Sequence, residues 1–438
     1  MVDNADAYWT CITLLARLEP AAEHRARAAE LLEVLDPEEV YARIVASRVY
    51  LPARETLGQL PPTEQVGTVQ KRLDQLITAE RLRCAAARPE LTAILTEAPA
   101  LGARVMKGLA LREHHRRPEL RHEGDIDLHV PEWHAALATS RWLRQRGWVC
   151  DTTEFSWLKC TDGGHLYGQL TLVLPDNEDP ISRVDLHIGP YSVGHAGNMP
   201  LAGWRDTEVL GVPAQEPDRE TTLALIAAHA LNDGVLSMKD INDLHELLVG
   251  EARTDWATVE ELCRGALAVD VLAQLLAVTG EIYPELGLPV GDVNGPLALS
   301  LTPAERADRA ARSAYRDERA RGADDDTATV VAEEARRYYS ADLRPRVAPP
   351  GEPVPARNRQ TCCRLLPTST WEPLAANIAL DRADDVPIAE RPWESGLTLI
   401  TQGPGTVLRA GDEIFVPTVW GEVHPTSLAL ASRLAGHA

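Results

Sequence analysis

The first hundred residues carry apolar side chains at helical spacing. The clearest positions recur at steps of three and are Trp9, Ile12, Leu15 and Leu18. A second apolar stripe continues to about residue 44, and a longer amphipathic stretch covers residues 63–95. Between them, residues 50–62 contain Pro52, Pro61 and Pro62 and predict a linker or short turn. We therefore expect a helical region over residues 1–100.

The pattern changes near residue 101, where a strand-like alternation begins. Ile126, Leu128 and Val130 alternate with polar residues, a period of two that is typical of a strand with one buried face. A helix is predicted from Pro131 to Gly147, because glycine commonly ends helices. Further strands are expected over residues 148–158, 168–174 and 183–188. Strands and helix together predict a compact core over residues 101–215.

The rest of the chain returns to helix and ends in short strands. Helical spacing covers residues 219–249 and 255–279, and the highly charged residues 302–339 predict one long surface helix. The proline-rich residues 344–357 are typical of a linker. We therefore expect a helical domain over residues 216–343 and a β-containing segment over residues 358–438. The fold class that follows is α+β.

The composition is that of an ordinary globular protein with a strong negative charge. The 438 residues include 44 basic and 65 acidic side chains, which gives a net charge of −21. Such a charge repels nucleic acid and anionic membranes at long range, so we expect neither as a partner. The chain has only four lysines among its basic residues, and this preference for arginine is typical of GC-rich bacterial genomes.

Three features predict a cytoplasmic protein. The chain contains no run of about 18 apolar residues that could cross a membrane. Its first residues are acidic and lack the basic and apolar regions of a signal peptide. The seven cysteines are odd in number and form no CxxC pair, which favours reduced thiols over a disulfide framework or a zinc site. The oligomeric state stays open.

The most informative segment places two carboxylates on one face of a strand. Asp125 and Asp127 are two residues apart and therefore point the same way, while the aliphatic residues between and after them point into a core. Two neighbouring carboxylates repel each other. A divalent cation relieves this repulsion, and Mg²⁺ in particular prefers oxygen ligands and bridges carboxylates to phosphates.

A second predicted strand repeats this design. In residues 183–188 the aliphatic side chains share one face, while Arg183, Asp185 and His187 share the other. If the two strands are neighbours, Asp185 adds a third carboxylate to Asp125 and Asp127. Three carboxylates on adjacent strands can hold two Mg²⁺ ions, as two-metal phosphoryl chemistry requires, and Mn²⁺ could replace them.

Four motifs in this part of the chain belong together: Lys107-Gly108, Arg121, Gly124-Asp125-Ile126-Asp127-Leu128 and Asp185-Leu186-His187. They resemble the bacterial uncharacterised nucleotidyltransferase family of the DNA polymerase β-like superfamily. The resemblance extends over about residues 30–290. It implies a polymerase β-like core, in which a mixed sheet has flanking helices, embedded in mostly helical N- and C-terminal regions. It also implies metal-dependent transfer of a nucleoside monophosphate.

The resemblance assigns roles by position. Asp125 and Asp127 would bind Mg²⁺, and Asp185 would complete a metal site and orient or deprotonate the acceptor hydroxyl. The residues that would contact or neutralise the phosphates of the nucleotide are Lys107, Gly108, Arg121 and, from the helical half, Lys239. The superfamily usually has Gly-Ser or Gly-Gly where this chain has Gly108-Leu109, so a hydroxyl contact to phosphate is missing and Lys107 could substitute for it.

Several of these residues also have simpler interpretations. Lys239 and Asp243 are spaced i, i+4, so a helix salt bridge competes with phosphate binding. The run Arg112–Arg117 could cover bound phosphates, but a solvated loop is the commoner role of such a run. His187 could bind substrate or orient Asp185, and a structural hydrogen bond is the alternative. His229 falls on an apolar helix face and is expected to be a core histidine.

The favoured activity is transfer of AMP from ATP to a hydroxyl of a small molecule, with release of pyrophosphate. A protein hydroxyl is an alternative acceptor. The 3′ end of RNA, as modified by some toxins, is another, although the net charge of −21 argues against it. A catalytically inactive relative that binds a nucleotide or a partner is the non-enzymatic alternative, which the intact carboxylates disfavour.

Overall fold

The computed structural model describes most of the chain. The described residues are 4–122, 125–152, 156–160, 165–175, 183–193, 197–233, 236–249, 253–266, 268–288, 303–320, 322–340, 346–347, 363–377, 386–394, 396–418 and 422–436. Gly124 of the acidic motif and most of the proline-rich residues 344–357 lie outside them.

The N-terminal region is helical. Its helices are α1 (Asn4–Ala16), α2 (Ala22–Leu32), α3 (Pro37–Ala46), α4 (Tyr50–Leu57) and α5 (Glu64–Glu97). The prediction of a linker or turn over residues 50–62 is wrong for residues 50–57, which form α4. Pro52 lies in the first turn of α4, where a missing backbone N–H breaks no helical hydrogen bond. Buried Tyr50, Ala53 and Leu57 hold this helix against the core.

The central element is a mixed sheet of eleven strands within the described residues. Its first part contains, in spatial order, β1 (Arg104–Met106), β2 (Ile126–Val130), β6 (Arg183–Ile188), β5 (Leu166–Val173) and β4 (Trp157–Cys160). The two-residue strand β3 (Val149–Cys150) pairs with β5. Strands β2 and β6 run parallel, with Asp127 opposite Asp185, and the other pairs of this part are antiparallel. The expected α+β class is thereby confirmed.

The two faces of this sheet differ in polarity because the side chains alternate along each strand. The aliphatic face of β2 and β6 packs against α7 (Trp133–Arg144) and the C-terminal half of α5. The opposite face carries the acidic residues. Helix α5 is 34 residues long, and its N-terminal half belongs to a different hydrophobic core from its C-terminal half. It therefore links the helical part of the molecule to the sheet.

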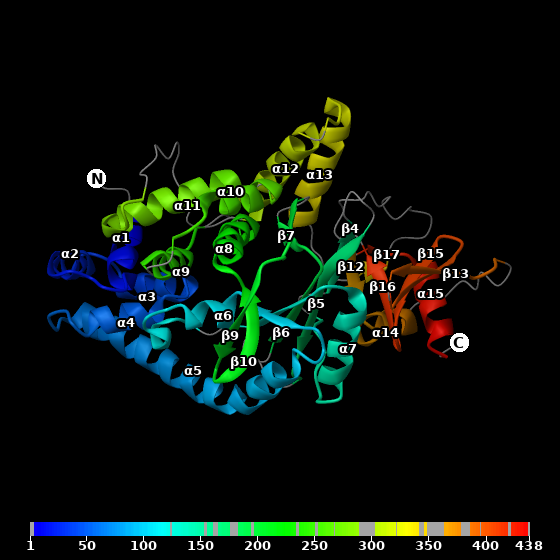
Figure 1. Ribbon diagram of the computed structural model, residues 1–438, viewed down its shortest axis with the longest axis horizontal. Helices are drawn as coiled ribbons and strands as arrows, with labels where there is room; N and C mark the ends of the chain where they lie inside the picture. The colour runs from blue at the N-terminus through cyan, green and yellow to red at the C-terminus, as the bar shows by residue number, and fades with distance from the viewer. Residues whose placement is uncertain are drawn as a thin grey trace.

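Helices from two distant parts of the sequence share one hydrophobic core. The second set is α8 (Arg219–Asp233), α9 (Met238–Val249), α10 (Trp256–Gly265) and α11 (Val269–Ile282), followed by the 3₁₀ helix η3 (Pro284–Leu286). Their apolar residues form one cluster with those of α1–α4 (Figure 1). Besides α5 and α7, the elements between these two sets that lie outside the main sheet are α6 (Gly108–Glu113), η1 (Pro118–Leu120), β7 (Tyr191–Val193), β8 (Gly197–Met199), β9 (Trp204–Val209) and β10 (Val212–Pro217).

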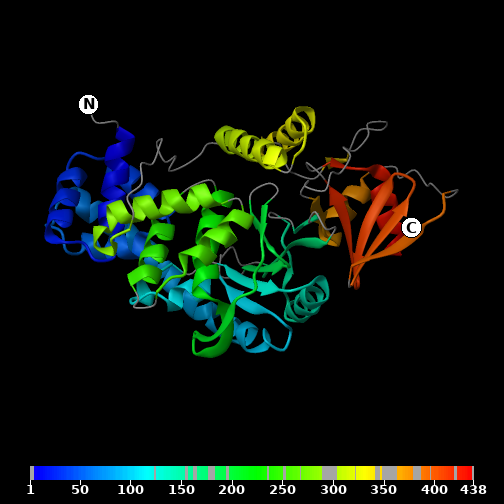
Figure 2. The same ribbon diagram turned by 45° about the horizontal axis from the view of Figure 1, so that its top comes forward.

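The prediction of a single helix over residues 302–339 is wrong. The chain forms two helices, α12 (Pro303–Ala320) and α13 (Asp325–Ser340), which pack as a hairpin (Figure 2). Gly322 adopts φ +87° in the turn, and the Asp324 carboxylate accepts a hydrogen bond from the Thr327 backbone N–H at 2.8 Å. These two residues reverse the chain, since glycine tolerates positive φ and aspartate caps helix N-termini.

The C-terminal segment continues the main sheet. Its elements are β12 (Cys363–Leu366), α14 (Thr368–Ala376), β13 (Ala389–Glu394), β14 (Leu397–Gln402), β15 (Gly405–Ala410), β16 (Glu413–Thr418), β17 (Glu422–Val423) and α15 (Pro425–Leu434). Strand β12 pairs antiparallel with both β4 and β16, which joins the two parts of the sheet. Strand β17 pairs with β11 (Arg346–Val347) in a separate two-stranded sheet.

Among the described residues, no helix is both long and apolar enough to cross a lipid bilayer.

Replacing Trp371 by alanine should destabilise the C-terminal segment. The side chain of Trp371 is fully buried, and its indole N–H donates to the Ile414 carbonyl at 2.8 Å. We expect the free energy of unfolding to fall by about 3–5 kcal/mol, since the change leaves a cavity and removes a buried hydrogen bond. Urea unfolding followed by circular dichroism measures it. The control is Trp256→Ala, at a tryptophan that is 38% exposed, and equal losses in both variants would contradict the prediction.

Candidate active site

The pairing of β2 with β6 brings three carboxylates together. Asp127 and Asp185 lie opposite each other in the parallel register, and Asp125 directly precedes β2. One carboxylate oxygen from each of the three lies within 4.8 Å of the others. Asp127 and Asp185 are buried, whereas Asp125 is half-buried at the edge of a pocket. The sequence placed these residues on one face, and the pairing makes them a cluster.

Two side chains, those of Lys107 and His187, stabilise the ionised form of Asp127. The Lys107 ammonium and the His187 Nε2 N–H both donate to Asp127 Oδ1, each at 2.8 Å. Burial alone would raise the pKa of Asp127, but Lys107 and His187 hold it well below its ordinary value. Burial raises the pKa of Asp125, and the nearby Asp127 charge adds to that effect. The cluster therefore carries a negative charge that needs a cation.

The cluster fits a divalent metal ion. All the donors are carboxylate oxygens, the ligands that hard cations such as Mg²⁺ and Mn²⁺ prefer. The Lys107 ammonium already occupies one side of the cluster, which shows that a positive charge is stabilised at this place. Asp125, Asp127 and Asp185 are thus the residues that could hold the metal.

The turn between β1 and α6 brings the backbone close to these carboxylates. Lys107 has φ +52° and ψ −122°, a conformation that side chains other than glycine rarely adopt. It is followed by Gly108, where a Cβ atom would lie 3.3 Å from the Asp125 carbonyl oxygen and 3.8 Å from Asp127 Oδ2. Glycine permits this approach. The Lys107 ammonium also lies 5.5 Å from the centre of the Tyr191 ring.

The structure gives Arg121 partners inside the protein. Its Nε and Nη2 groups donate to the two oxygens of Asp243 at 2.7 and 3.0 Å, and its Nη1 group donates to the Gly108 carbonyl at 2.6 Å. These contacts position the start of α6 against α9. Arg121 also lines the pocket, so the direct contact with phosphates that the resemblance implies stays a prediction.

Lys239 forms the expected helix salt bridge, and its contact with phosphate stays a prediction. Its ammonium lies 3.1 Å from Asp240 Oδ1 and 3.6 Å from Asp243 Oδ2, which includes the i, i+4 salt bridge. Lys239 and Asp240 also line the pocket. The two accessory residues on β6 have carboxylate partners as well. Arg183 donates to Asp185 at 3.2 Å. Of the roles left open for His187, the structure shows a hydrogen bond to a carboxylate, that of Asp127.

The basic run 112–117 makes structural ion pairs. His115 Nε2 contacts Asp243 at 2.7 Å, and Arg116 donates to Glu246 at 2.9 Å. Arg117 pairs with Glu55 at 2.6 Å. The run therefore holds the loop before β2 against neighbouring helices. It is not the solvated loop that we expected, because Arg112 and Glu113 belong to α6 and His115 is buried.

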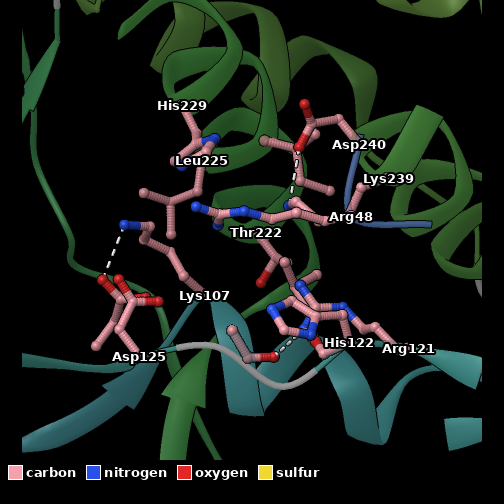
Figure 3. A pocket seen from close by; sticks show the side chains of 14 residues that line it. Arg48, Lys107, Arg121, His122, Asp125, Thr222, Leu225, His229, Lys239 and Asp240 are labelled. Atoms are coloured by element: carbon pink, nitrogen blue, oxygen red, sulfur yellow. Dashed lines mark hydrogen bonds and ion pairs between the residues drawn. The ribbon is translucent and has the colours of Figure 1, made fainter. Parts of the chain in front are cut away.

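A pocket opens beside the carboxylates and extends toward the helical half of the molecule (Figure 3). It encloses about 670 Å³ of empty space, part of it open to solvent. Its lining comes from α6, the loop before β2, α8, α9 and the turn after α3, and consists of Arg48, Lys107, Gly108, Leu111, Arg121, His122, Asp125, Asp127, Thr222, Leu225, Ile226, His229, Lys239 and Asp240.

Some of these residues were not expected from the sequence. His229 is partly exposed on the pocket wall and is not a core histidine. Burial lowers the pKa of His229, and the positive charge of Lys107 adds to that effect. Arg48 lies in a segment without a motif, and His122 was not singled out although it lies between the motif residues Arg121 and Gly124.

Comparison with known proteins identifies the family. The family model described as "Uncharacterised nucleotidyltransferase" matches residues 33–284, more than half of the chain. The chain belongs to this nucleotidyltransferase family. The matched range includes the three carboxylates, the turn at Lys107 and the helices that carry Lys239. Family membership makes this chain a nucleotidyl-transfer enzyme and implies a nucleoside triphosphate as its substrate.

The other comparisons add little to what the family match shows about this nucleotidyltransferase. No curated protein matches the chain significantly. One solved structure is similar to part of it, described as an antigenic nucleotidyltransferase-like protein from Paracoccidioides brasiliensis. It is 14% identical, covers 47% of this chain and 93% of its own, and has a TM-score of 0.29. A likeness at this level supports no inference about the site.

Replacing Asp243 by asparagine should destabilise the nucleotidyltransferase strongly. The Asp243 side chain is fully buried between Arg121, His115 and Lys239. Burial alone would raise the pKa of Asp243, but Arg121 and Lys239 hold it well below its ordinary value. Removing the charge leaves the buried Arg121 unneutralised, so the free energy of unfolding should fall by about 3–5 kcal/mol.

Urea unfolding monitored by circular dichroism measures this loss. The control is Asp233→Asn, because the Asp233 side chain is 58% exposed and lies 3.6 Å from His229. We expect a loss below about 1 kcal/mol there. A loss of that size in Asp243→Asn as well would show that the buried network contributes nothing.

Proposed function

We propose that this enzyme transfers AMP from ATP to a hydroxyl of a small-molecule acceptor, with Mg²⁺ as its cofactor and pyrophosphate as its second product. The observation that carries the proposal is the arrangement of charges around one pocket. Asp125 and Asp127 of the carboxylate cluster line one end of the pocket, and its lining also includes the basic residues Arg48, Lys107, Arg121 and Lys239. A nucleoside triphosphate with a bound cation requires this combination of acidic and basic groups.

Asp125, Asp127 and Asp185 would hold the metal, with two Mg²⁺ ions expected and Mn²⁺ as a possible replacement. When bound, Mg²⁺ supplies charge neutralisation at the α-phosphate and lowers the pKa of the attacking hydroxyl. Because the carboxylates are then neutralised, Lys107 no longer has to neutralise Asp127. Its ammonium becomes available to a phosphate oxygen, and the backbone at Gly108 leaves room for that phosphate.

The reaction is an in-line displacement at the α-phosphorus. The acceptor oxygen forms a bond to this phosphorus, and the bond to the oxygen that bridges to the β-phosphate breaks. Pyrophosphate leaves with the negative charge, which Lys107 and Lys239 neutralise. Asp185 orients the acceptor hydroxyl and takes its proton. Residues Leu111, Leu225 and Ile226 supply an apolar wall on which a nucleobase can pack.

A small acceptor fits the charge of the molecule better than RNA does. The net charge of −21 opposes a polyanion, and the pocket beside the carboxylates is lined by side chains of both charges and by apolar groups, as a small molecule requires. A protein hydroxyl is the second candidate acceptor. Both activities would be compatible with a cytoplasmic location, which stays a prediction, as does the choice of adenine.

Binding of ATP should require both Mg²⁺ and the carboxylates. Isothermal titration calorimetry on the full chain, with and without Mg²⁺, needs no knowledge of the acceptor. We expect one ATP to bind in the presence of Mg²⁺, and the variant Asp125→Asn/Asp127→Asn to bind at least about tenfold more weakly, since it lacks charged oxygen ligands. The control is Asp206→Asn, at an exposed aspartate that accepts a hydrogen bond from Gln215.

The outcomes separate the alternatives. Binding that is independent of Mg²⁺ and unchanged in the double variant would refute the proposed site. Binding as expected, without pyrophosphate release for any acceptor tried, would favour a nucleotide-binding protein that lacks catalysis. Thermal unfolding of each variant shows whether a loss of binding reflects a loss of folding.

A further inference from the structure

Arg48 occupies a backbone position that normally belongs to glycine. It follows the C-cap residue of α3, Ser47, and has φ +54°. The Arg48 N–H donates to the Val45 carbonyl at 2.9 Å, and the Val49 N–H donates to the Ile44 carbonyl at 3.3 Å. These two hydrogen bonds form a Schellman motif, whose left-handed residue is usually glycine because a Cβ atom is strained there.

The positive φ of Arg48 indicates that its side chain has a role, because glycine would fit this backbone position with less strain. Within the described residues, three non-glycine residues have positive φ, and two of them, Arg48 and Lys107, line the same pocket. The third, Leu210, lies in the turn between β9 and β10. Strained residues of this kind concentrate at binding and catalytic sites, where the surrounding structure holds them. Two basic side chains are therefore held in strained positions around one pocket.

The Arg48 side chain extends into this pocket with its guanidinium end on the side of Lys107 (Figure 3). In the described part of the chain, this guanidinium makes no hydrogen bond or ion pair. Arg121, in the same pocket, donates to both oxygens of Asp243. Arg48 thus differs from Arg121 in having its donors free for a ligand.

We propose that Arg48 binds the terminal phosphate of the nucleoside triphosphate. The proposal rests on the proposed function, which places the α-phosphate at Asp125 and Asp127. Arg48 lines the same pocket as these carboxylates without forming an ion pair with them, and its side chain extends toward Lys107 (Figure 3). We therefore place the outer phosphates of a chain that starts at the carboxylates beside Arg48. A guanidinium presents two parallel N–H groups, which match the oxygens of a terminal phosphate.

This assignment makes the N-terminal helices part of the nucleotide site. In the sequence, the turn after α3 lies more than fifty residues before Asp125, the first of the three clustered carboxylates. It reaches the pocket because α1–α4 share a core with α8–α11, and two of these helices, α8 and α9, line the pocket. Arg48 would therefore distinguish a triphosphate from a diphosphate, since only the triphosphate extends to it.

The test measures the affinities of ATP, ADP and AMP in the presence of Mg²⁺ by calorimetry. The variant Arg48→Gly should bind ATP about ten- to hundredfold more weakly than the wild type, as expected when a charge-assisted contact is lost. Its affinity for ADP should change less, and its affinity for AMP should not change. The thermal midpoint of unfolding should stay the same or rise, because glycine relieves the positive φ. Arg48→Lys should retain part of the affinity for ATP.

The control is Arg27→Ala, at an exposed arginine of α2 that pairs with Glu30 and should leave all three affinities unchanged. The proposal is overturned if Arg48→Gly binds ATP as tightly as the wild type, or if ATP, ADP and AMP weaken equally. In those cases Asp125→Asn/Asp127→Asn still tests the proposed function separately. A wild-type protein that binds no nucleotide would overturn both.

Discussion

The buried ion pair between Asp243 and Arg121 is the constraint on which the site depends. Asp243 has no exposed side-chain surface, and Arg121 is almost as deeply buried. An isolated charge in this environment would be strongly destabilising, so the two groups hold each other in place. Arg121 also donates to the Gly108 carbonyl, which couples helix α9 to the turn beside the carboxylates. The two walls of the pocket therefore keep a defined relative position.

Around this pair, the sheet separates apolar and ionic groups by simple alternation. The aliphatic side chains of β2 and β6 pack against α5 and α7, while the other face holds Asp127, Asp185 and His187. Lys107 keeps Asp127 charged despite its burial. An acidic protein with a net charge of −21 thus places four basic side chains, those of Arg48, Lys107, Arg121 and Lys239, around one pocket.

The site also depends on the packing of the helical region. Its two sets of helices are separated in the sequence by the strands of the sheet. Helices α1–α4 and α8–α11 bury their apolar faces against one another, and α5 continues from this core to the core beneath the sheet. This packing keeps the turn after α3 at the pocket. It also explains how Arg48 and Lys107 persist in strained conformations, since the surrounding helices and strands leave the backbone no alternative.

The sequence by itself determined the features that depend on near neighbours. A period of two placed Asp125 with Asp127 and Asp185 with His187 on polar faces, and a run of motifs indicated the family, later confirmed over residues 33–284. Helix α4 and the hairpin of α12 and α13 were missed, because burial and a local turn outweighed the proline and charge patterns. Only the tertiary structure decided that Asp127 pairs with Asp185, that Arg121 is neutralised by Asp243, and that Arg48 enters the pocket. These contacts join residues far apart in the chain, and their partners are set by how whole helices and strands pack, which no local spacing of residues records.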